Sequence, residues 1–291
     1  MLKLKVKLLR FILRPFLNTK GGGDIQYLNV ASENGSIRVL KYLPAKPGKH
    51  PVHVNLHGGG WTMGLADMDN FWCRRVADET ESAVISIDYA KAPEHPFPTA
   101  IHQVRDVILS LNDSPDLDVS RFTIGGFSSG GNLAIAYVLY CLQNNLALPV
   151  LCLPVYPATD LSIPYSVKLE SVSDKAKDKS VPSWMADIFF KSYTSDYENI
   201  LVSPSLAPTE LLSQFPRTVV LNGNLDALHI EADKFANLLA ENGVDVVHRL
   251  YEDAVHGFTH TEKGQDDYNE KAKEDALQLM IQEIKQAHQS L

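Results

Sequence analysis

The fold is decided by the stretch Gly126-Phe127-Ser128-Ser129-Gly130, which directly follows the short apolar run Phe122–Ile124. The apolar run predicts a buried strand, and a helical pattern begins near Asn132. A G-x-S-x-G sequence between a strand and a helix is typical of a tight turn that holds a nucleophilic serine above a sheet. A phosphate-binding loop would need a lysine after the last glycine, but Asn132 stands there. The stretch therefore predicts Ser128 as a nucleophile in an α/β fold.

Short apolar runs recur on both sides of this stretch and alternate with helical patterns. Further strands are predicted at Val52–Leu56, Ala83–Ile87, Val150–Val155, Thr218–Leu221 and Val244–Leu250, and helices at Ala100–Leu111, Asn132–Leu142 and Glu231–Glu241. Buried strands that alternate with helices predict βαβ units and a mostly parallel, doubly wound sheet flanked by helices. Before them, residues 26–30 and 37–40 alternate around the turn signal Asn34-Gly35, which predicts an antiparallel hairpin.

Two segments fall outside this alternation. The first 20 residues hold six basic side chains and no acidic one, on an otherwise apolar helical pattern. Residues 159–204 combine a polar stretch with an aromatic cluster that includes Trp184 and Phe189. We expect a single domain over residues 1–291 with a helical cap, formed by about residues 1–22 and the insertion 159–204. The alternative for the positively charged N-terminal segment is a membrane-surface or targeting helix, with peripheral membrane contact through residues 1–20.

A second glycine-rich stretch, His57-Gly58-Gly59-Gly60, follows the predicted strand Val52–Leu56. Ligands of open parallel sheets bind at the carboxyl ends of strands, and glycines let backbone N–H groups approach a substrate oxygen. We expect the N–H groups of Gly58, Gly59 and Ser129 to form an oxyanion hole, and His57 to have a structural role. Aromatic residues are predicted to bind the substrate: Trp61, Trp184 and Phe189.

The general base and the acid that would act with Ser128 can be predicted from the order of residues along the chain. A serine triad on this kind of sheet runs serine, acid, histidine, with the histidine after the last strand. His256 meets this condition, whereas His248 lies inside a strand pattern and His260 comes four residues later. Asp226 lies in the loop after a late strand; Asp253 is the rival acid but is too close to His256 in sequence. A zinc site at His256 and His260 lacks the HExxH pattern and a third ligand.

Composition narrows the protein class. A net charge of −8 argues against nucleic acid as a partner. Three cysteines without a short metal-binding spacing indicate reduced, buried thiols. A cytoplasmic location is therefore expected, with organelle or membrane-surface association as the alternative. The sequence leaves the oligomeric state open, a dimer included.

Several motifs together resemble the hormone-sensitive-lipase-like family of esterases and lipases. The matching blocks run in order between Val52 and Phe258: His57-Gly-Gly-Gly-Trp61, Asp88-Tyr-Ala-Lys-Ala-Pro-Glu94-His-Pro-Phe-Pro98, Gly126-Phe-Ser-Ser-Gly-Gly-Asn132, Asp226-Ala-Leu228 and His256-Gly-Phe258. The resemblance implies an eight-stranded α/β-hydrolase fold with a cap, short- to medium-chain acyl esters as substrates, a place in lipid metabolism and no cofactor. Family members often carry an acidic residue where Phe127 stands and alanine where Ser129 stands.

We therefore expect a serine carboxylic ester hydrolase that works through an acyl-enzyme intermediate, with Ser128, His256 and Asp226 as the triad. Three alternatives use the same fold. One is a catalytically silent receptor for a small molecule, which retention of all three residues disfavours. The second is a peptidase or amidase, for which the triple-glycine loop is less typical by resemblance. The third is a membrane-surface lipase for longer acyl chains, which the basic amphipathic start favours.

Overall fold

The computed structural model describes residues 2–13, 19–33 and 35–289. Within them, one sheet of eight strands runs in the order β1-β2-β4-β3-β5-β6-β7-β8. The strands are β1 (Gln26–Ser32), β2 (Gly35–Tyr42), β3 (His50–Leu56), β4 (Ala83–Asp88), β5 (Leu117–Phe127), β6 (Leu151–Val155), β7 (Arg217–Leu225) and β8 (Val246–Val255). Strands β3 to β8 are parallel, and β2 joins β1 and β4 by antiparallel pairing. The predicted fold class, an eight-stranded and mostly parallel α/β-hydrolase sheet, is confirmed.

The predicted hairpin is present at the edge of the sheet, where β1 pairs with β2 and Ser32 lies opposite Gly35. Asn34, the first residue of the turn signal, lies outside the described residues.

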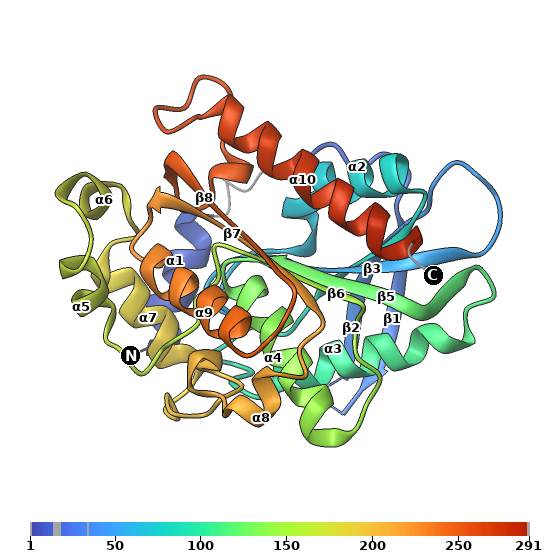
Figure 1. Cartoon of the computed structure of the whole chain (residues 1–291), viewed down its shortest axis with the longest axis horizontal. Helices are drawn as coiled ribbons and strands as arrows, with labels where there is room; N and C mark the ends of the chain where they lie inside the picture. The colour runs from blue at the N-terminus through green and yellow to red at the C-terminus, as the bar shows by residue number, and fades with distance from the viewer. Residues whose placement is uncertain (1, 14–18, 34, 290–291) are drawn as a thin grey trace.

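Helices cover both faces of the sheet (Figure 1). The α-helices of the described residues are α1 (Leu2–Leu13), α2 (Asn70–Thr80), α3 (Thr99–Ser110), α4 (Ser129–Asn144), α5 (Tyr165–Glu170), α6 (Asp174–Lys179), α7 (Ser183–Tyr193), α8 (Thr209–Leu212), α9 (His229–Glu241) and α10 (Glu270–Gln289). Helices α3, α4 and α9 pack on one face, and α2 and α10 on the other. Each face has its own hydrophobic cluster, and alternate residues of the central strands contribute to the two. The apolar runs of the sequence reflect this burial on both faces.

Strand lengths and one helix differ from the prediction. Strand β8 continues to Val255 because it stays paired with β7 up to the Leu225–Val255 pair. Strand β5 begins at Leu117, which pairs with His50 at the start of β3. Helix α2 was not predicted, because its many charged residues weaken the apolar pattern; it is held by its buried side, which includes Trp72. Long-range pairing and packing fixed these features.

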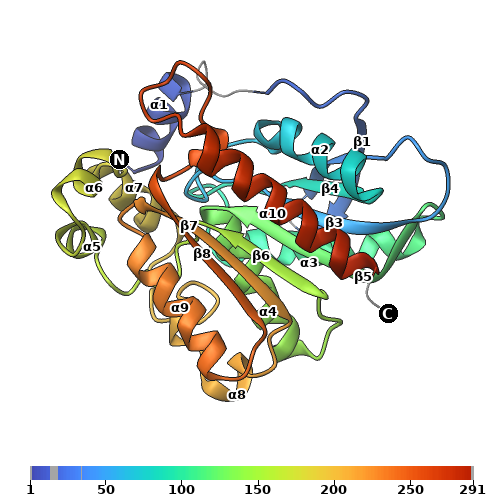
Figure 2. The same ribbon diagram turned by 45° about the horizontal axis from the view of Figure 1, so that its top comes forward.

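Residues 159–204 carry the short helices α5 and α6 and the longer α7. Figure 2 shows these three helices at one end of the sheet, with α1 on the same side of the molecule. Helices α1 and α7 pack against each other, although 169 residues lie between them in sequence. Over the described residues, no helix is both long enough and apolar enough to cross a membrane.

Candidate active site

Ser128 lies at the carboxyl end of β5, on the sharp turn between this strand and α4. Its backbone has φ 54° and ψ −117°, a conformation that L residues rarely adopt and that is typical of strained functional turns. The turn passes very close to β3, since a Cβ atom on Gly130 would lie 2.0 Å from the Leu56 carbonyl oxygen. Only glycine fits at this contact. The glycines of the G-x-S-x-G stretch thus bring Ser128 against the end of β3.

Three predicted residues form one hydrogen-bonded chain. The Nε2 atom of His256 lies 2.8 Å from the Ser128 Oγ, and its Nδ1 atom lies 2.6 Å from an Asp226 carboxylate oxygen. Asp226 and His256 directly follow β7 and β8, which are neighbours and pair at Leu225–Val255. Because a carboxylate only accepts hydrogen bonds, the imidazole proton sits on Nδ1. Nε2 is then left to accept from the serine hydroxyl.

The surroundings of His256 suit a proton acceptor. Burial lowers the pKa of its imidazole, but the charge of Asp226 and the hydrogen bond to it outweigh burial, so the pKa lies above its ordinary value of 6.5. Asp226 is fully buried, and its other carboxylate oxygen accepts from the Leu228 N–H at 3.0 Å. The carboxylate is therefore fixed in place before any substrate binds.

The rival residues lie elsewhere. His248 pairs with Asp233 of α9 at 2.8 Å, and Asp253 is exposed and pairs with Lys175. His260 lies near the site but contacts a different carboxylate, that of Asp69, at 3.0 Å. Among these histidines, only His256 is hydrogen-bonded to Ser128.

The glycine-rich loop after β3 lies directly beside Ser128. A Cβ atom on Gly58 would lie 3.6 Å from the Ser128 Cβ atom, and Gly59 has a positive φ of 124°. Ser129 is the first residue of α4, and the N–H groups of a first helical turn have no acceptor within the helix. The structure thus brings Gly58, Gly59 and Ser129 around the serine, at the positive end of the helix dipole.

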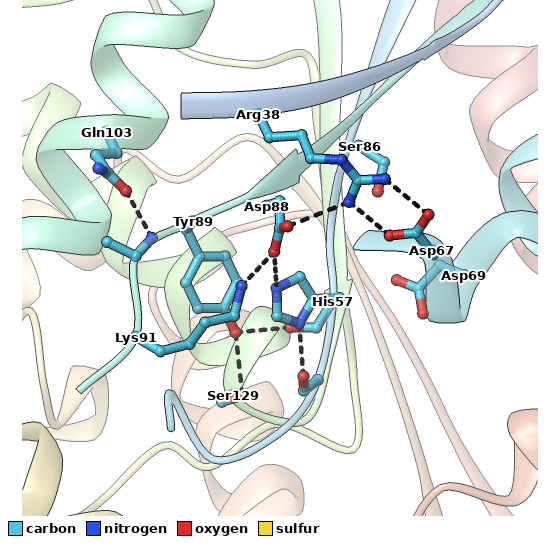
Figure 3. Close-up of polar contacts among 12 residues, drawn as sticks. Arg38, His57, Asp67, Asp69, Ser86, Asp88, Tyr89, Lys91, Gln103 and Ser129 are labelled. Atoms are coloured by element: carbon cyan, nitrogen blue, oxygen red, sulfur yellow. Dashed lines mark hydrogen bonds and ion pairs between the residues drawn. The ribbon is translucent and has the colours of Figure 1, made fainter. Parts of the chain in front are cut away.

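The buried ring of His57 contacts the glycine-rich loop. The ring is fully buried, stacks on Tyr89 at 4.3 Å between centroids, and has Nδ1 2.7 Å from the Gly58 carbonyl oxygen. The Tyr89 hydroxyl donates to the His57 carbonyl oxygen at 2.9 Å (Figure 3). Burial lowers the pKa of His57 to about 4, so the ring is neutral. The structural role predicted for His57 is consistent with these contacts.

A network of ion pairs lies next to the His57 ring. Asp88 contacts Lys91 and Arg38, and the Arg38 guanidinium also pairs with Asp67 at 2.6 Å (Figure 3). Burial raises the pKa of Asp88, but these cations hold it below its ordinary range. Asp88 lies 3.7 Å from the His57 Nε2 atom. The sequence block that begins at Asp88 therefore supports the glycine-rich loop through His57 and does not reach Ser128.

Ser128 and His256 open into a mostly apolar cavity of about 290 Å³. Part of the wall comes from the glycine loop and from Trp61. The insertion supplies another part through α5, α7 and the loop just before α7, and its lining residues are Tyr165, Val181, Met185, Ala186, Phe189 and Phe190. The cap-side wall therefore consists almost entirely of apolar and aromatic groups.

The aromatic residues predicted to bind substrate divide into two groups. Trp61 and Phe189 line the cavity; Trp61 stacks on Tyr193 at 4.5 Å, and a Cβ atom on Gly60 would lie 2.4 Å from the Phe189 ring. Trp184 is 58% exposed and is not among the cavity-lining residues. The aromatic cluster in sequence did not reveal which faces of α7 point inward.

The sequence analysis did not predict the polar part of the cavity wall, which includes Asp69, Tyr156 and His260. There, His260 contacts Asp69 through Nε2, while its Nδ1 atom lies 3.1 Å from the Tyr156 hydroxyl. The Phe127 ring packs edge-on against His260, with 4.6 Å between the ring centroids. The spacing of His256 and His260 was the only signal for this wall, because Asp69 comes from a distant segment. Over the described residues, no group of three His, Cys, Asp or Glu side chains could hold a metal ion. The three cysteines are buried and free, as predicted.

Comparisons with known proteins agree with this fold. A family model described as alpha/beta hydrolase fold matches residues 53–260. An arylesterase of Saccharolobus solfataricus is 28% identical over 241 residues, which cover 81% of this chain and 77% of the relative. An esterase of Gibberella moniliformis is 30% identical, with 72% of this chain and 67% of the relative covered. The solved structure of a hyperthermophilic esterase from Pyrobaculum calidifontis has a TM-score of 0.79 and 26% identity, over 96% of this chain and 93% of that one. The chain therefore belongs to the α/β hydrolase fold family, in its hormone-sensitive-lipase-like group of esterases.

Proposed function

We propose that the chain hydrolyses carboxylic esters, with Ser128 as nucleophile, His256 as general base and Asp226 as the orienting acid. The observation that carries the proposal is the hydrogen-bonded chain from the Asp226 carboxylate through His256 to the Ser128 Oγ, at the floor of an apolar cavity. Relatives that share most of the chain are named as esterases, which supports the same reaction class.

The reaction proceeds in two halves. The Ser128 Oγ attacks the acyl carbon while its proton passes to His256 Nε2, and the negative charge forms on the carbonyl oxygen between the N–H groups of Gly58, Gly59 and Ser129. Collapse of this intermediate breaks the ester bond, and the leaving alkoxide takes the proton from the imidazolium. Water then attacks the acyl-enzyme by the same route, which releases the carboxylic acid and restores Ser128. Asp226 stabilises the imidazolium in both halves.

The cavity favours esters of short to medium chain length. Its volume of about 290 Å³ is at the lower end of the range for small-molecule sites. The apolar cap side suits an acyl or alkyl chain, and no charged side chain of the cap lines it. A lipase for longer chains is the second candidate, favoured by the exposed apolar side chains of α1.

We further propose that residues 1–22 and 159–204 act as a cap on a single hydrolase domain. The insertion supplies a large part of the cavity wall, and α1 packs on α7. Residues 14–18, which lie within the first of these segments, are outside the described residues. A cytoplasmic location stays a prediction, which cell fractionation can test, and the oligomeric state stays open, which light scattering can determine.

The test is a panel of p-nitrophenyl esters with increasing acyl length, together with labelling by a fluorophosphonate. We expect turnover that falls for the longest chains, and one covalent adduct on Ser128 identified by mass spectrometry. Ser128→Ala and His256→Ala should each lower turnover by at least about 10³-fold with an unchanged fold. The matched control is Ser129→Ala, which keeps the backbone N–H and should stay within a few-fold of wild type. A chain that takes no label and turns over no ester, yet binds an ester tightly, would be a receptor instead.

A further inference from the structure

Helix α1 turns an apolar stripe toward solvent. Leu4, Leu8, Phe11 and Ile12 follow the spacing i, i+4, i+7 and i+8, which places them on one face of the helix. All four are exposed; Phe11 is 78% and Leu4 72% accessible. In an ordinary surface helix such a stripe faces the protein core, so its outward direction needs another explanation.

The opposite side of the helix is fixed to the protein. Val6 and Leu9 are buried. The Arg10 guanidinium donates to the carbonyl oxygens of Thr62 and Ala92, each at 2.7 Å, and pairs with Glu94 at 2.9 Å. These contacts set the rotation of α1 about its own axis. The apolar stripe cannot turn inward without breaking them.

Lysines flank the stripe on both sides. Lys3 and Lys7, four residues apart, lie along one edge, and Lys5 lies along the other, next to Leu8. All three lysines are exposed, and the helix carries no acidic residue although the whole chain has a net charge of −8. An apolar face bordered by lysines is the pattern of helices that lie in the headgroup region of an anionic membrane.

The stripe belongs to a helix that touches the cavity wall. Helix α1 packs on α7, which supplies Met185, Ala186, Phe189 and Phe190 to the lining. Thr62, which accepts a hydrogen bond from Arg10, lies between the lining residues Trp61 and Met63. A surface bound to α1 would therefore lie close to the elements that form the cavity.

We propose that the outward face of α1, namely Leu4, Leu8, Phe11 and Ile12 with Lys3, Lys5 and Lys7, docks the protein on an anionic lipid bilayer. The four apolar side chains enter the boundary between headgroups and acyl chains, and the lysine ammonium groups meet the lipid phosphates. A second copy of the chain fits less well, because a symmetric contact through this face would bring six lysines together. The proposal does not depend on the ester hydrolysis proposed above.

The test is flotation of the full chain with vesicles of phosphatidylcholine, alone or with about one third phosphatidylserine. We expect binding to the anionic vesicles that weakens as salt is added. Replacing Leu4, Leu8 and Phe11 by Gln should weaken binding at least about tenfold, because the inserted apolar area is lost. Replacing Lys3, Lys5 and Lys7 by Gln should weaken it roughly 100-fold on anionic vesicles only. Glutamine retains helix propensity, so α1 should persist in both variants.

The matched control replaces Tyr27 and Leu109, two exposed apolar residues outside α1, by Gln and should bind as wild type does. Circular dichroism and thermal unfolding verify the fold of every variant without reference to activity. Three results would overturn the proposal: no flotation of the wild type, equal flotation of wild type and both triple variants, or a wild-type dimer in solution that the Leu4, Leu8 and Phe11 variant converts to monomer.

Discussion

Replacement of Lys168 by Met should strongly destabilise the protein, because it leaves the buried Glu231 carboxylate without its cationic partner. Lys168 lies on α5 of the insertion and forms an ion pair with Glu231 on α9, and the two side chains are only 5% and 8% exposed. Glu231 also accepts from the Thr159 N–H at 2.8 Å, and Lys168 donates to the Asp160 carbonyl oxygen at 2.5 Å. These contacts tie the segment from Thr159 to Lys168 to α9 at both of its ends.

The size of the destabilisation follows from the burial of Lys168 and Glu231. Breaking a buried ion pair by removal of one partner costs about 3–5 kcal/mol of unfolding free energy, because the remaining charge is buried without compensation. With an unfolding entropy of about 2.1 cal/mol/K per residue, a chain of 291 residues should then show a fall in Tm of roughly 5–8 °C. Replacing both partners by Met should recover much of the loss, because no charge is then left buried.

The loss of unfolding free energy in Lys168→Met should also depend on pH. Burial already raises the pKa of Glu231, although Lys168 opposes the shift. In Lys168→Met the folded-state pKa lies higher still, above the unfolded value. A carboxyl group whose pKa is raised on folding favours the folded state at low pH, and this contribution is lost as pH rises through the folded-state pKa. The loss of stability in Lys168→Met should therefore be smaller near pH 5 than at pH 8.

The assay is urea unfolding followed by circular dichroism at both pH values, for wild type, the two single variants and the double variant. Lys177→Met is the matched control, since its pair with Glu170 is partly exposed and lies on the surface of the insertion. The free energy of unfolding of Lys177→Met should stay close to that of wild type, because solvent screens an exposed ion pair. A Lys168→Met variant as stable as this control, or a double variant no more stable than the single one, would refute the reasoning.

Two further predictions concern the site. In wild type, kcat/KM should fall on the acid side with an apparent pKa above 6.5, because protonated His256 cannot accept the serine proton and Asp226 raises its pKa. In Asp226→Asn this inflection should move to lower pH and the rate should drop by about 10⁴-fold; an unmoved inflection in a pH–rate profile would contradict the assignment. Phe189→Ala should widen the cap side of the cavity and shift the preferred acyl chain to greater length, whereas Trp184→Ala should leave the preference unchanged. Identical chain-length profiles for these two variants would show that Phe189 does not contact the acyl chain.

The fold could be predicted from the sequence because its signals are local. Strand β3 and its glycine loop, and β5 with its elbow, each combine an apolar run with residues whose backbone needs are specific. The G-x-S-x-G context predicted Ser128, and the order serine, acid, histidine along the chain then favoured Asp226 and His256 over the rival residues. Burial on both faces of the sheet was visible as continuous apolar runs.

Other features were decided only by the tertiary structure. The contact of His260 with Asp69 joins residues 191 positions apart, so no sequence spacing could indicate it. The direction of α7, which puts Phe189 in the cavity and Trp184 in solvent, depends on packing against the rest of the chain. The apolar stripe of α1 was readable from the sequence, but periodicity gives the same pattern for a face turned inward or outward. The Arg10 contacts with Thr62, Ala92 and Glu94 set that direction, because they fix the helix by groups that lie far away in sequence.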